Sequence, residues 1–209
     1  MKNIASYRYL TMDVFSEQVL QGNQLAVFPN ASGISDVTMQ QIAAELNLAE
    51  TAFIFPATRA DCAVGVRIFT PKRELSFAGH PTIGTSFVVL EEQFVPRGTS
   101  EFFLEEKIGP VRIRVEPGIR PLIWLVTPPL TFGKSYDAHH CAKALGLNVS
   151  DLLQVSPQVV SAGNPTLIVA ARDKHHVDKA AFDSAGLTLL KTKEEPPLLV
   201  MVFTPTSEG

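Results

Sequence analysis

The chain has 209 residues, a length that fits one large domain or two small ones. Hydrophobic residues make up 45% of the chain and charged residues 19%, so a packed core is expected and disorder is excluded as the default state. The 18 Lys and Arg residues against 21 Asp and Glu residues give a net charge of −3, which argues against a broadly basic nucleic-acid-binding surface.

In the first part of the chain, β-branched and aromatic runs predict strands at residues 7–15, 25–28, 51–55 and 63–69. The first two are expected to pair as a hairpin, because Gly22 and Asn23 break the chain between them. A helix is predicted over residues 37–48, where apolar side chains recur at near-helical spacing and Ser35 and Asp36 are available as caps.

Residues 81–90 (PTIGTSFVVL) predict a helix of a different kind, although their β-branched content leaves a strand as the alternative. Pro81 suits a first helical turn, and the residues after it are apolar or small on every side. A helix without a polar stripe is normally surrounded by protein, so we expect its large side chains to be deeply buried. These side chains are Ile83, Phe87, Val88 and Leu90.

Later strands are predicted at residues 101–106, 111–115, 122–126, 159–160, 166–171 and 198–203. A short helix is predicted at residues 138–147. Many strands with few helices indicate an α+β fold rather than regular βαβ units. Proline and glycine around residues 117–121 favour a domain boundary there, giving expected domains 1–118 and 119–209.

The sequence predicts a soluble, cytoplasmic protein. Residues 1–10 lack the apolar core of a secretory signal, and the longest uncharged run, 152–171, contains Pro, Gly, Asn and Gln, which a lipid-spanning helix tolerates poorly. The two cysteines, Cys62 and Cys141, form neither a disulfide framework nor a metal-binding spacing. Dinucleotide, P-loop and G-x-S-x-G motifs are absent from the sequence, and the adjacent histidine pairs do not have zinc-ligand spacing.

Two segments could carry acid–base chemistry. Glu50 falls between a predicted helix end and an apolar strand, where a carboxylate can be partly shielded from water, although a solvated surface Glu is the commoner case. His80 directly precedes the helix start at Pro81, whose backbone N–H groups could hold an anion; a histidine satisfied by the backbone is the alternative. The turn at residues 161–165 is more often structural.

Six runs along the chain carry a recognisable pattern: YLTMDVF (9–15), GNQLAV (22–27), NLAETAF (47–53), RIFTP (67–71), ELSFAGHPTIG (74–84) and the turn GNP (163–165). Together, these motifs resemble those of the PhzF-like phenazine biosynthesis proteins, which share the diaminopimelate epimerase fold. Gln24 and Ala49 depart mildly from the family's usual Pro and Ser.

The resemblance implies two similar domains, each a curved mixed sheet around a central helix, with the site in the cleft between them. It also implies an isomerase without cofactor or metal, commonly a homodimer, which moves a proton on a small anionic, carboxylated substrate. The charge balance and the polar residues of the 152–171 run predict neither a nucleic-acid nor a membrane partner. Glu50 corresponds to the general acid/base, and His80 assists it. The substrate-binding residues implied by the resemblance are Gly79, Pro81, Thr82 and Asn23.

One family segment, Glu-Asp-Pro-x-Thr-Gly-Ser ahead of a second central helix, is not found in this sequence. We therefore expect an incomplete second domain that lacks half of the site and leaves apolar surface uncovered. Two alternatives to the isomerase stay open. The chain could be a catalytically incomplete member that acts as a binding or interaction protein, or a two-thiol epimerase or racemase, for which Ala78 stands where a thiol is needed.

Overall fold

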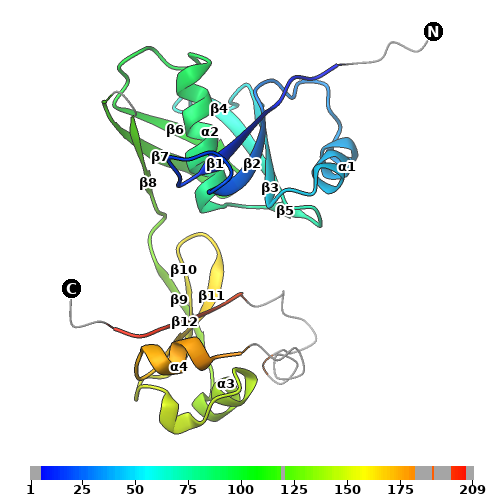
Figure 1. Cartoon of the computed structure of the whole chain (residues 1–209). Coiled ribbons are helices and arrows are strands. Elements are labelled where there is room, and N and C mark those ends of the chain that lie inside the picture. The colour runs from blue at the N-terminus through cyan, green and yellow to red at the C-terminus, as the bar shows by residue number, and fades with distance from the viewer. Residues whose placement is uncertain (1–5, 119–120, 182–189, 191–198, 206–209) are drawn as a thin grey trace. The chain divides into compact units, whose positions relative to one another are not determined.

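The computed structural model describes residues 6–118, 121–181, 190 and 199–205. The chain divides into two compact units, Met1–Pro128 and Pro129–Gly209 (Figure 1). This division lies later in the chain than the domain boundary expected after residue 118, because strand β8 (Leu122–Val126) pairs with strand β7 (Gly109–Glu116) and so belongs to the first unit. Residues 119–120, at the expected boundary, lie outside the described residues.

The described residues of the first unit form an 8-stranded mixed sheet and two helices. Its remaining strands are β1 (Leu10–Val14), β2 (Asn23–Phe28), β3 (Glu50–Phe55), β4 (Val64–Phe69), β5 (Glu74–Leu75) and β6 (Glu101–Glu106). Its helices are α1 (Asp36–Leu46) and α2 (Gly79–Glu91). The strand order is β1-β2-β3-β4-β6-β7-β8, with β5 paired to β4. The predicted β1–β2 hairpin is confirmed, and the α+β class with it.

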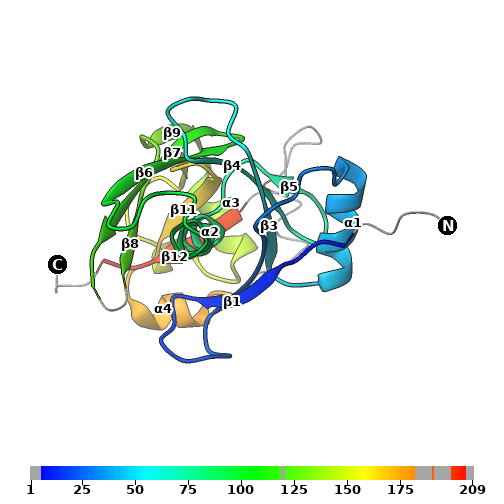
Figure 2. The same cartoon turned by 90° about the horizontal axis from the view of Figure 1, so that it is seen from above.

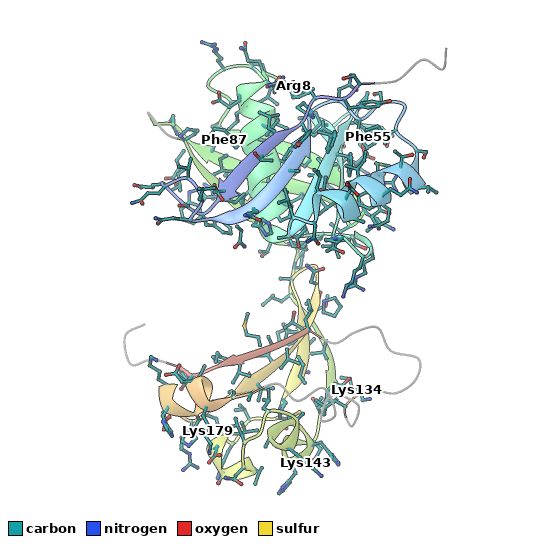
Figure 3. The ribbon with its side chains drawn as sticks, turned by 45° about the vertical axis from the view of Figure 1, so that its right-hand side comes forward. Arg8, Phe55, Phe87, Lys134, Lys143 and Lys179 are labelled. Carbon is teal, nitrogen blue, oxygen red and sulfur yellow. The ribbon has the colours of Figure 1, made fainter. Side chains whose placement is uncertain are left out.

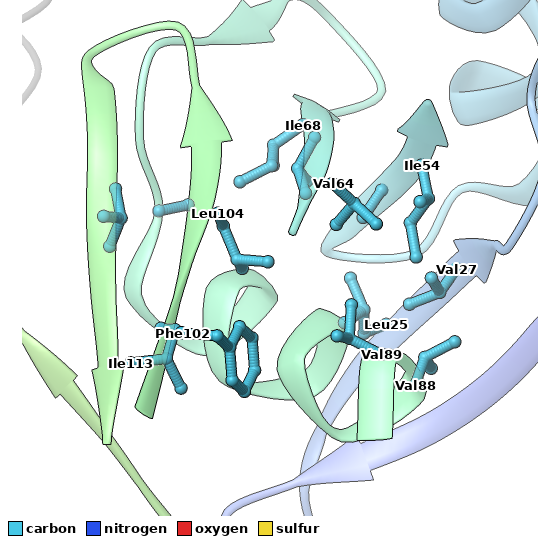
Figure 4. Packing of buried hydrophobic residues seen from close by; sticks show 14 of the residues in the cluster. Leu25, Val27, Ile54, Val64, Ile68, Val88, Val89, Phe102, Leu104 and Ile113 are labelled. Atoms are coloured by element: carbon cyan, nitrogen blue, oxygen red, sulfur yellow. The ribbon is translucent and has the colours of Figure 1, made fainter. Parts of the chain in front are cut away.

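The helix predicted over residues 81–90 is α2, and the sheet curls around it. Figure 2 views α2 along its axis with β1, β3, β4, β6 and β8 arranged around it. Inward-facing side chains of the strands pack against Val88 and Val89 of the helix (Figure 4). Gly84 lets α2 approach the sheet closely, because a Cβ there would lie 2.5 Å from Leu25 Cδ2.

The expectation that α2 is buried on every side is wrong at Phe87. Its side chain (labelled in Figure 3) is 42% exposed, Ile83 and Leu90 are only partly buried, and Val88 alone of the four is fully buried. The reason is the sheet order: β1 and β8 are the two edges and do not pair with each other among the described residues. Phe87 therefore lines an apolar groove between these two edges, together with Met12, Trp124 and others.

Helix α1 covers the opposite face of the central strands. Its N-cap is Ser35, as expected from the sequence, and the Ser35 hydroxyl accepts a hydrogen bond from the backbone N–H of Thr38. Its buried residues Met39 and Ala43 pack with Phe53 and neighbouring aromatic rings. Strand β3 is thus covered by α2 on one face and by α1 on the other.

The second unit contains a four-stranded sheet in the order β12-β11-β10-β9. Its elements are β9 (Thr131–Ser135), α3 (Ala138–Ala144), the 3-10 helix η1 (Val149–Asp151), β10 (Gln158–Ser161), β11 (Pro165–Ala170), α4 (Lys174–Lys179) and β12 (Leu199–Phe203). Strand β9 and helix α4 were not predicted, and Leu198, the first residue of the last predicted strand, lies outside the described residues. Among the described residues, no helix is long and apolar enough to cross a membrane.

Candidate active site

Glu50 is placed by the end of α1 and the start of β3. Asn47 ends the helix in the left-handed conformation, with φ of 50°, and its N–H donates to the carbonyl of Ala43. The chain then turns, and Glu50 enters the sheet as the first residue of β3, opposite Leu25 of the parallel strand β2. This entry leaves the Glu50 side chain only 17% exposed at the edge of an apolar strand, which is the shielded case and not the commoner solvated one.

His80 is the second residue of α2. The residue before the helix, Ala78, has extended backbone and contributes no side-chain cap. The helix start is therefore formed by backbone alone, which leaves N–H groups of the first turn without an intrahelical partner. A Cβ placed on Gly79 would meet nothing within 4 Å, so this start faces open space.

The structure brings the two predicted acid–base residues together. His80 Nε2 lies 3.0 Å from Glu50 Oε2, with the side chains 13% and 17% exposed. Both atoms are shielded from solvent, and neither has a well-aligned hydrogen bond within the described part of the chain, so the contact is an ion pair or close polar contact rather than a linear hydrogen bond. A carboxylate and an imidazole in this arrangement can exchange a proton with a third group placed beside them.

The other residues expected to bind substrate differ in which polar groups are available to a ligand. Pro81 has no N–H and is buried, and the N–H of Thr82 donates to the carbonyl of Ala78. The Thr82 hydroxyl is fully buried and contacts Ala78 and Glu106. Both polar groups of Thr82 are used inside the protein, so a role in substrate binding has no support from its contacts. The first-turn N–H groups of Gly79 and His80 are the better candidates for holding an anion.

Asn23 lies at the same end of the sheet as Glu50. Strands β2 and β3 run parallel, and Asn23 begins β2 two residues before the position that pairs with Glu50. The Asn23 side chain is exposed. The predicted turn at residues 161–165 is the β10–β11 hairpin of the second unit, with Gly163 at φ of 118°.

Sequence reasoning missed Glu106, the last residue of β6. Its side chain is 5% exposed, and burial raises the pKa of Glu106 to about 7, with a smaller opposing effect from the Thr82 hydroxyl. The only local signal was a second carboxylate in the run Phe102–Glu106, at an inward position of an alternating strand, where an apolar residue is expected.

Neither cysteine has the environment of a nucleophile. Cys141 on α3 is fully buried, and burial raises the pKa of its thiol to about 11. Cys62, half-buried in the loop before β4, also has a raised pKa, from burial and then from the charges of Asp61 and Glu105. In the described ranges, no group of three or more His, Cys, Asp or Glu side chains is arranged to hold a metal ion.

Comparison with known proteins finds a matching family model and several relatives. The family model described as "Phenazine biosynthesis-like protein" (PhzC-PhzF) matches residues 12–208. The trans-2,3-dihydro-3-hydroxyanthranilate isomerase of Pseudomonas chlororaphis is 32% identical over 184 residues, which is 85% of this chain and 64% of that protein. An uncharacterized isomerase of Mesorhizobium japonicum is 46% identical over 107 residues, covering 51% of this chain and 35% of the relative.

A solved structure agrees with this result. The structure described as a predicted epimerase from Pseudomonas aeruginosa is 30% identical and superposes with a TM-score of 0.74. The match covers 95% of this chain and 70% of that one. The chain thus spans about one third to two thirds of the length of the two curated relatives.

Proposed function

The chain belongs to the phenazine biosynthesis-like protein family (PhzC-PhzF), and from that premise we propose that it is an isomerase acting by acid–base chemistry on a small carboxylated substrate. The observation that carries the proposal is the partly buried pair of Glu50 and His80, 3.0 Å apart at the open start of α2. The names of the relatives, several of them isomerases, support the reaction class.

In this proposal Glu50 is the group that moves the proton. Its carboxylate takes a proton from a substrate carbon next to an unsaturated group, and the electron pair of the broken C–H bond shifts into that unsaturated system. The protonated Glu50, whose carboxyl proton exchanges with solvent, then delivers a proton to a different carbon, so the substrate is isomerised and the enzyme is regenerated. No oxidant, reductant or cofactor enters this balance.

His80 and the helix start have supporting roles. His80 Nε2 lies close enough to Glu50 to orient its carboxylate and to hydrogen-bond the substrate as charge develops. The first-turn N–H groups of α2 would hold the substrate's carboxylate, because a helix start without a side-chain cap favours an anion. The proposal also includes a cytoplasmic homodimer, in keeping with the family resemblance, and analytical ultracentrifugation would test the dimer.

The first experiment measures proton transfer directly. The protein is incubated in D2O with trans-2,3-dihydro-3-hydroxyanthranilate, the compound in the relative's name, and with a panel of small unsaturated carboxylic acids. Isomerisation and deuterium incorporation at carbon are followed by NMR. Glu50→Gln is expected to lower turnover by roughly 10²–10⁴-fold, the usual effect of removing a positioned acid/base.

A matched control separates chemistry from surface charge. Glu45 is an exposed carboxylate on the last turn of α1, and Glu45→Gln removes the same charge close by in sequence. This control should turn over at the wild-type rate. Near-normal turnover by Glu50→Gln would remove Glu50 from the mechanism, while equal loss in both variants would point to a charge effect.

A binding role is the second candidate, favoured by one specific observation. Glu50, His80 and all four residues expected to bind substrate lie in the first unit, so the second unit contributes no residue to the candidate site as identified. The same experiment distinguishes the two functions. A carboxylate ligand that perturbs the amide signals of Gly79 and His80, without any deuterium exchange by the wild-type protein, would select binding over isomerisation.

A further inference from the structure

Glu106 forms an unusual contact with the helix that carries His80. Its Oε1 lies 2.5 Å from the hydroxyl of Thr82 in the first turn of α2, and its Oε2 is buried with no hydrogen-bond partner among the described residues. The same Thr82 hydroxyl lies 2.6 Å from the carbonyl oxygen of Ala78. Two oxygens, one from Glu106 and one from Ala78, therefore contact a single hydroxyl group inside the protein.

The number of hydrogen atoms available to the three groups determines which of these two short contacts is a hydrogen bond. A threonine hydroxyl has one hydrogen to donate, and a carbonyl oxygen can only accept. If the Thr82 hydroxyl donates to Ala78, the second short contact is a hydrogen bond only when Glu106 carries a proton and donates it to Thr82. If Glu106 is ionised, Thr82 must donate to it, and two oxygen atoms then face each other at 2.6 Å with no hydrogen between them.

We propose that Glu106 is a positioning residue: as a neutral carboxylic acid it donates to Thr82, and this chain of two hydrogen bonds fixes Ala78 and the first turn of α2, on which Gly79 and His80 lie. The positioning role rests on the proposed function of His80, whereas the protonation state does not. The burial that raises the pKa of Glu106 to about 7 agrees with this geometry.

A second contact ties the same two segments together. The β6–β7 hairpin turn, which begins directly after Glu106, sends the N–H of Ile108 to the carbonyl of Ser76 at 3.1 Å. Ser76 lies two residues before Ala78. The start of α2 is thus held to the β6–β7 turn at two points, one through backbone and one through the buried acid.

The other charged groups on the surrounding elements are engaged elsewhere. On β6 itself, Glu105 accepts hydrogen bonds from Thr58 and Arg59. On the adjoining turn, Lys107 lies 3.3 Å from Glu74 of β5. On β3 and α2, Glu50 and His80 are close to each other. Ionisation of Glu106 is therefore opposed mainly by its burial and is met by the Thr82 hydroxyl alone.

The test is an NMR titration of the whole chain, without substrate. The side-chain carboxyl carbon of Glu106 is followed from about pH 4 to about pH 9, a range that spans the ordinary glutamate pKa and the raised one. We expect a midpoint near 7, and we expect the amide signals of Gly79 and His80 to move with the same midpoint. A Glu106 midpoint near its ordinary value of 4.5 would overturn the proposal.

Variants separate positioning from simple packing. Glu106→Gln keeps a neutral hydrogen-bond donor, so the amide signals of Gly79 and His80 should match those of the wild type at low pH and lose their response near pH 7. Glu105→Gln, the neighbouring carboxylate on the same strand, should leave that response intact. Thr82→Val removes the shared hydroxyl and should shift the Gly79 and His80 signals at every pH. A response that persists in Glu106→Gln would assign it to another group and contradict the proposal.

The result of the Glu106 titration does not depend on whether the protein catalyses the proposed isomerisation. If Glu50→Gln fails to slow turnover, the proposed function falls while the midpoint of Glu106 still stands. If the site is active and the midpoint is ordinary, only the positioning role falls. Where turnover is measurable, Glu106→Gln should flatten the pH profile of kcat above pH 7 and leave KM almost unchanged.

Discussion

Strands β3 and β12 have nearly the same apolar pattern and different surroundings. The run Ala52–Phe55 of β3 and the whole of β12, Leu199–Phe203, are continuous stretches of hydrophobic residues, a pattern typical of strands covered on both faces. In β3 both faces are covered: Ala52 and Ile54 pack toward α2, and Phe53 packs toward α1.

Among the described residues, β12 packs against a core with one face only. Val200 and Val202 pack toward the core of the second unit, where α3 lies. Leu199, Met201 and Phe203 alternate with them and are 49%, 55% and 39% exposed. An apolar pattern therefore indicates what a strand can bury, and the elements around the strand decide what it does bury. The incomplete second domain expected from the sequence stays a prediction.

The largest difference between the two strands is expected from a matched pair of aromatic truncations. Phe53 is fully buried and stacks on Phe28 with ring centres 4.8 Å apart, so Phe53→Ala should lower the free energy of unfolding of the first unit by about 3–5 kcal/mol. Phe203→Ala on β12 should cost about 1 kcal/mol, because much of that ring is already in water. Urea unfolding, followed by tryptophan and amide signals, measures both losses in the free energy of unfolding. Equal losses would mean that the two aromatic rings are equally buried in solution.

The second largest effect is a pH dependence of the stability of the first unit, which contains Glu106. The pKa of Glu106 is raised from 4.5 in an unfolded chain to about 7 in the folded protein, so the folded state binds the proton more tightly. The contribution of Glu106 to stability is then greatest below about pH 4.5, falls as the pH rises from there to 7 and levels off above it, a total loss of at most about 3.5 kcal/mol at about 1.4 kcal/mol per pH unit. Glu106→Gln should remove this fall. The free energy of unfolding of the wild type and of Glu106→Gln is measured at several pH values. The same pH dependence in both proteins would contradict this prediction.

Phe87 provides a smaller effect within α2 itself. Full burial of Phe87, as expected from the sequence, would correspond to a loss of about 3–5 kcal/mol for Phe87→Ala. With 42% of the side chain exposed in the groove between β1 and β8, we now expect about 1–2 kcal/mol. Val88→Ala, one position along and fully buried, is the internal reference and should cost at least as much despite its smaller side chain. A loss for Phe87→Ala as large as that for Phe53→Ala would mean that the groove is filled in solution.

These expectations show which features the sequence could predict. The α1 cap at Ser35 and the β1–β2 hairpin at Gly22 depend on residues close together in the chain, and the sequence predicted both. The helix expected from Pro81 begins two residues earlier, at Gly79, so His80 lies inside it and not before it. The exposure of Phe87 depends on whether β1 and β8 meet, which no local pattern contains. Glu106 is buried by residues from α2, some 24 positions away in the chain, so its raised pKa could not be seen in the run Phe102–Glu106.

The smallest effect on stability is expected on the exposed face of β12. Met201→Lys places a charge where the side chain is already 55% exposed, and it should change the free energy of unfolding by no more than about 0.5 kcal/mol. The neighbouring substitution Val202→Lys puts the same charge on the half-buried side that packs toward the core of the second unit, and it should be more destabilising than Met201→Lys, because the charge loses part of its contact with water. Since strand side chains alternate, this pair tests which face is covered with one chemical change at adjacent positions.

The same two substitutions, Met201→Lys and Val202→Lys, should also have different effects on solubility. An uncovered apolar row on a strand favours association between molecules, and a lysine within it opposes association by charge repulsion. Met201→Lys should therefore raise the concentration at which the protein stays monodisperse in light scattering, with its unfolding curve unchanged, and Val202→Lys should lower that concentration. If Met201→Lys instead destabilised the second unit as much as Val202→Lys, both faces of β12 would be covered in solution, and β3 and β12 would be equivalent after all.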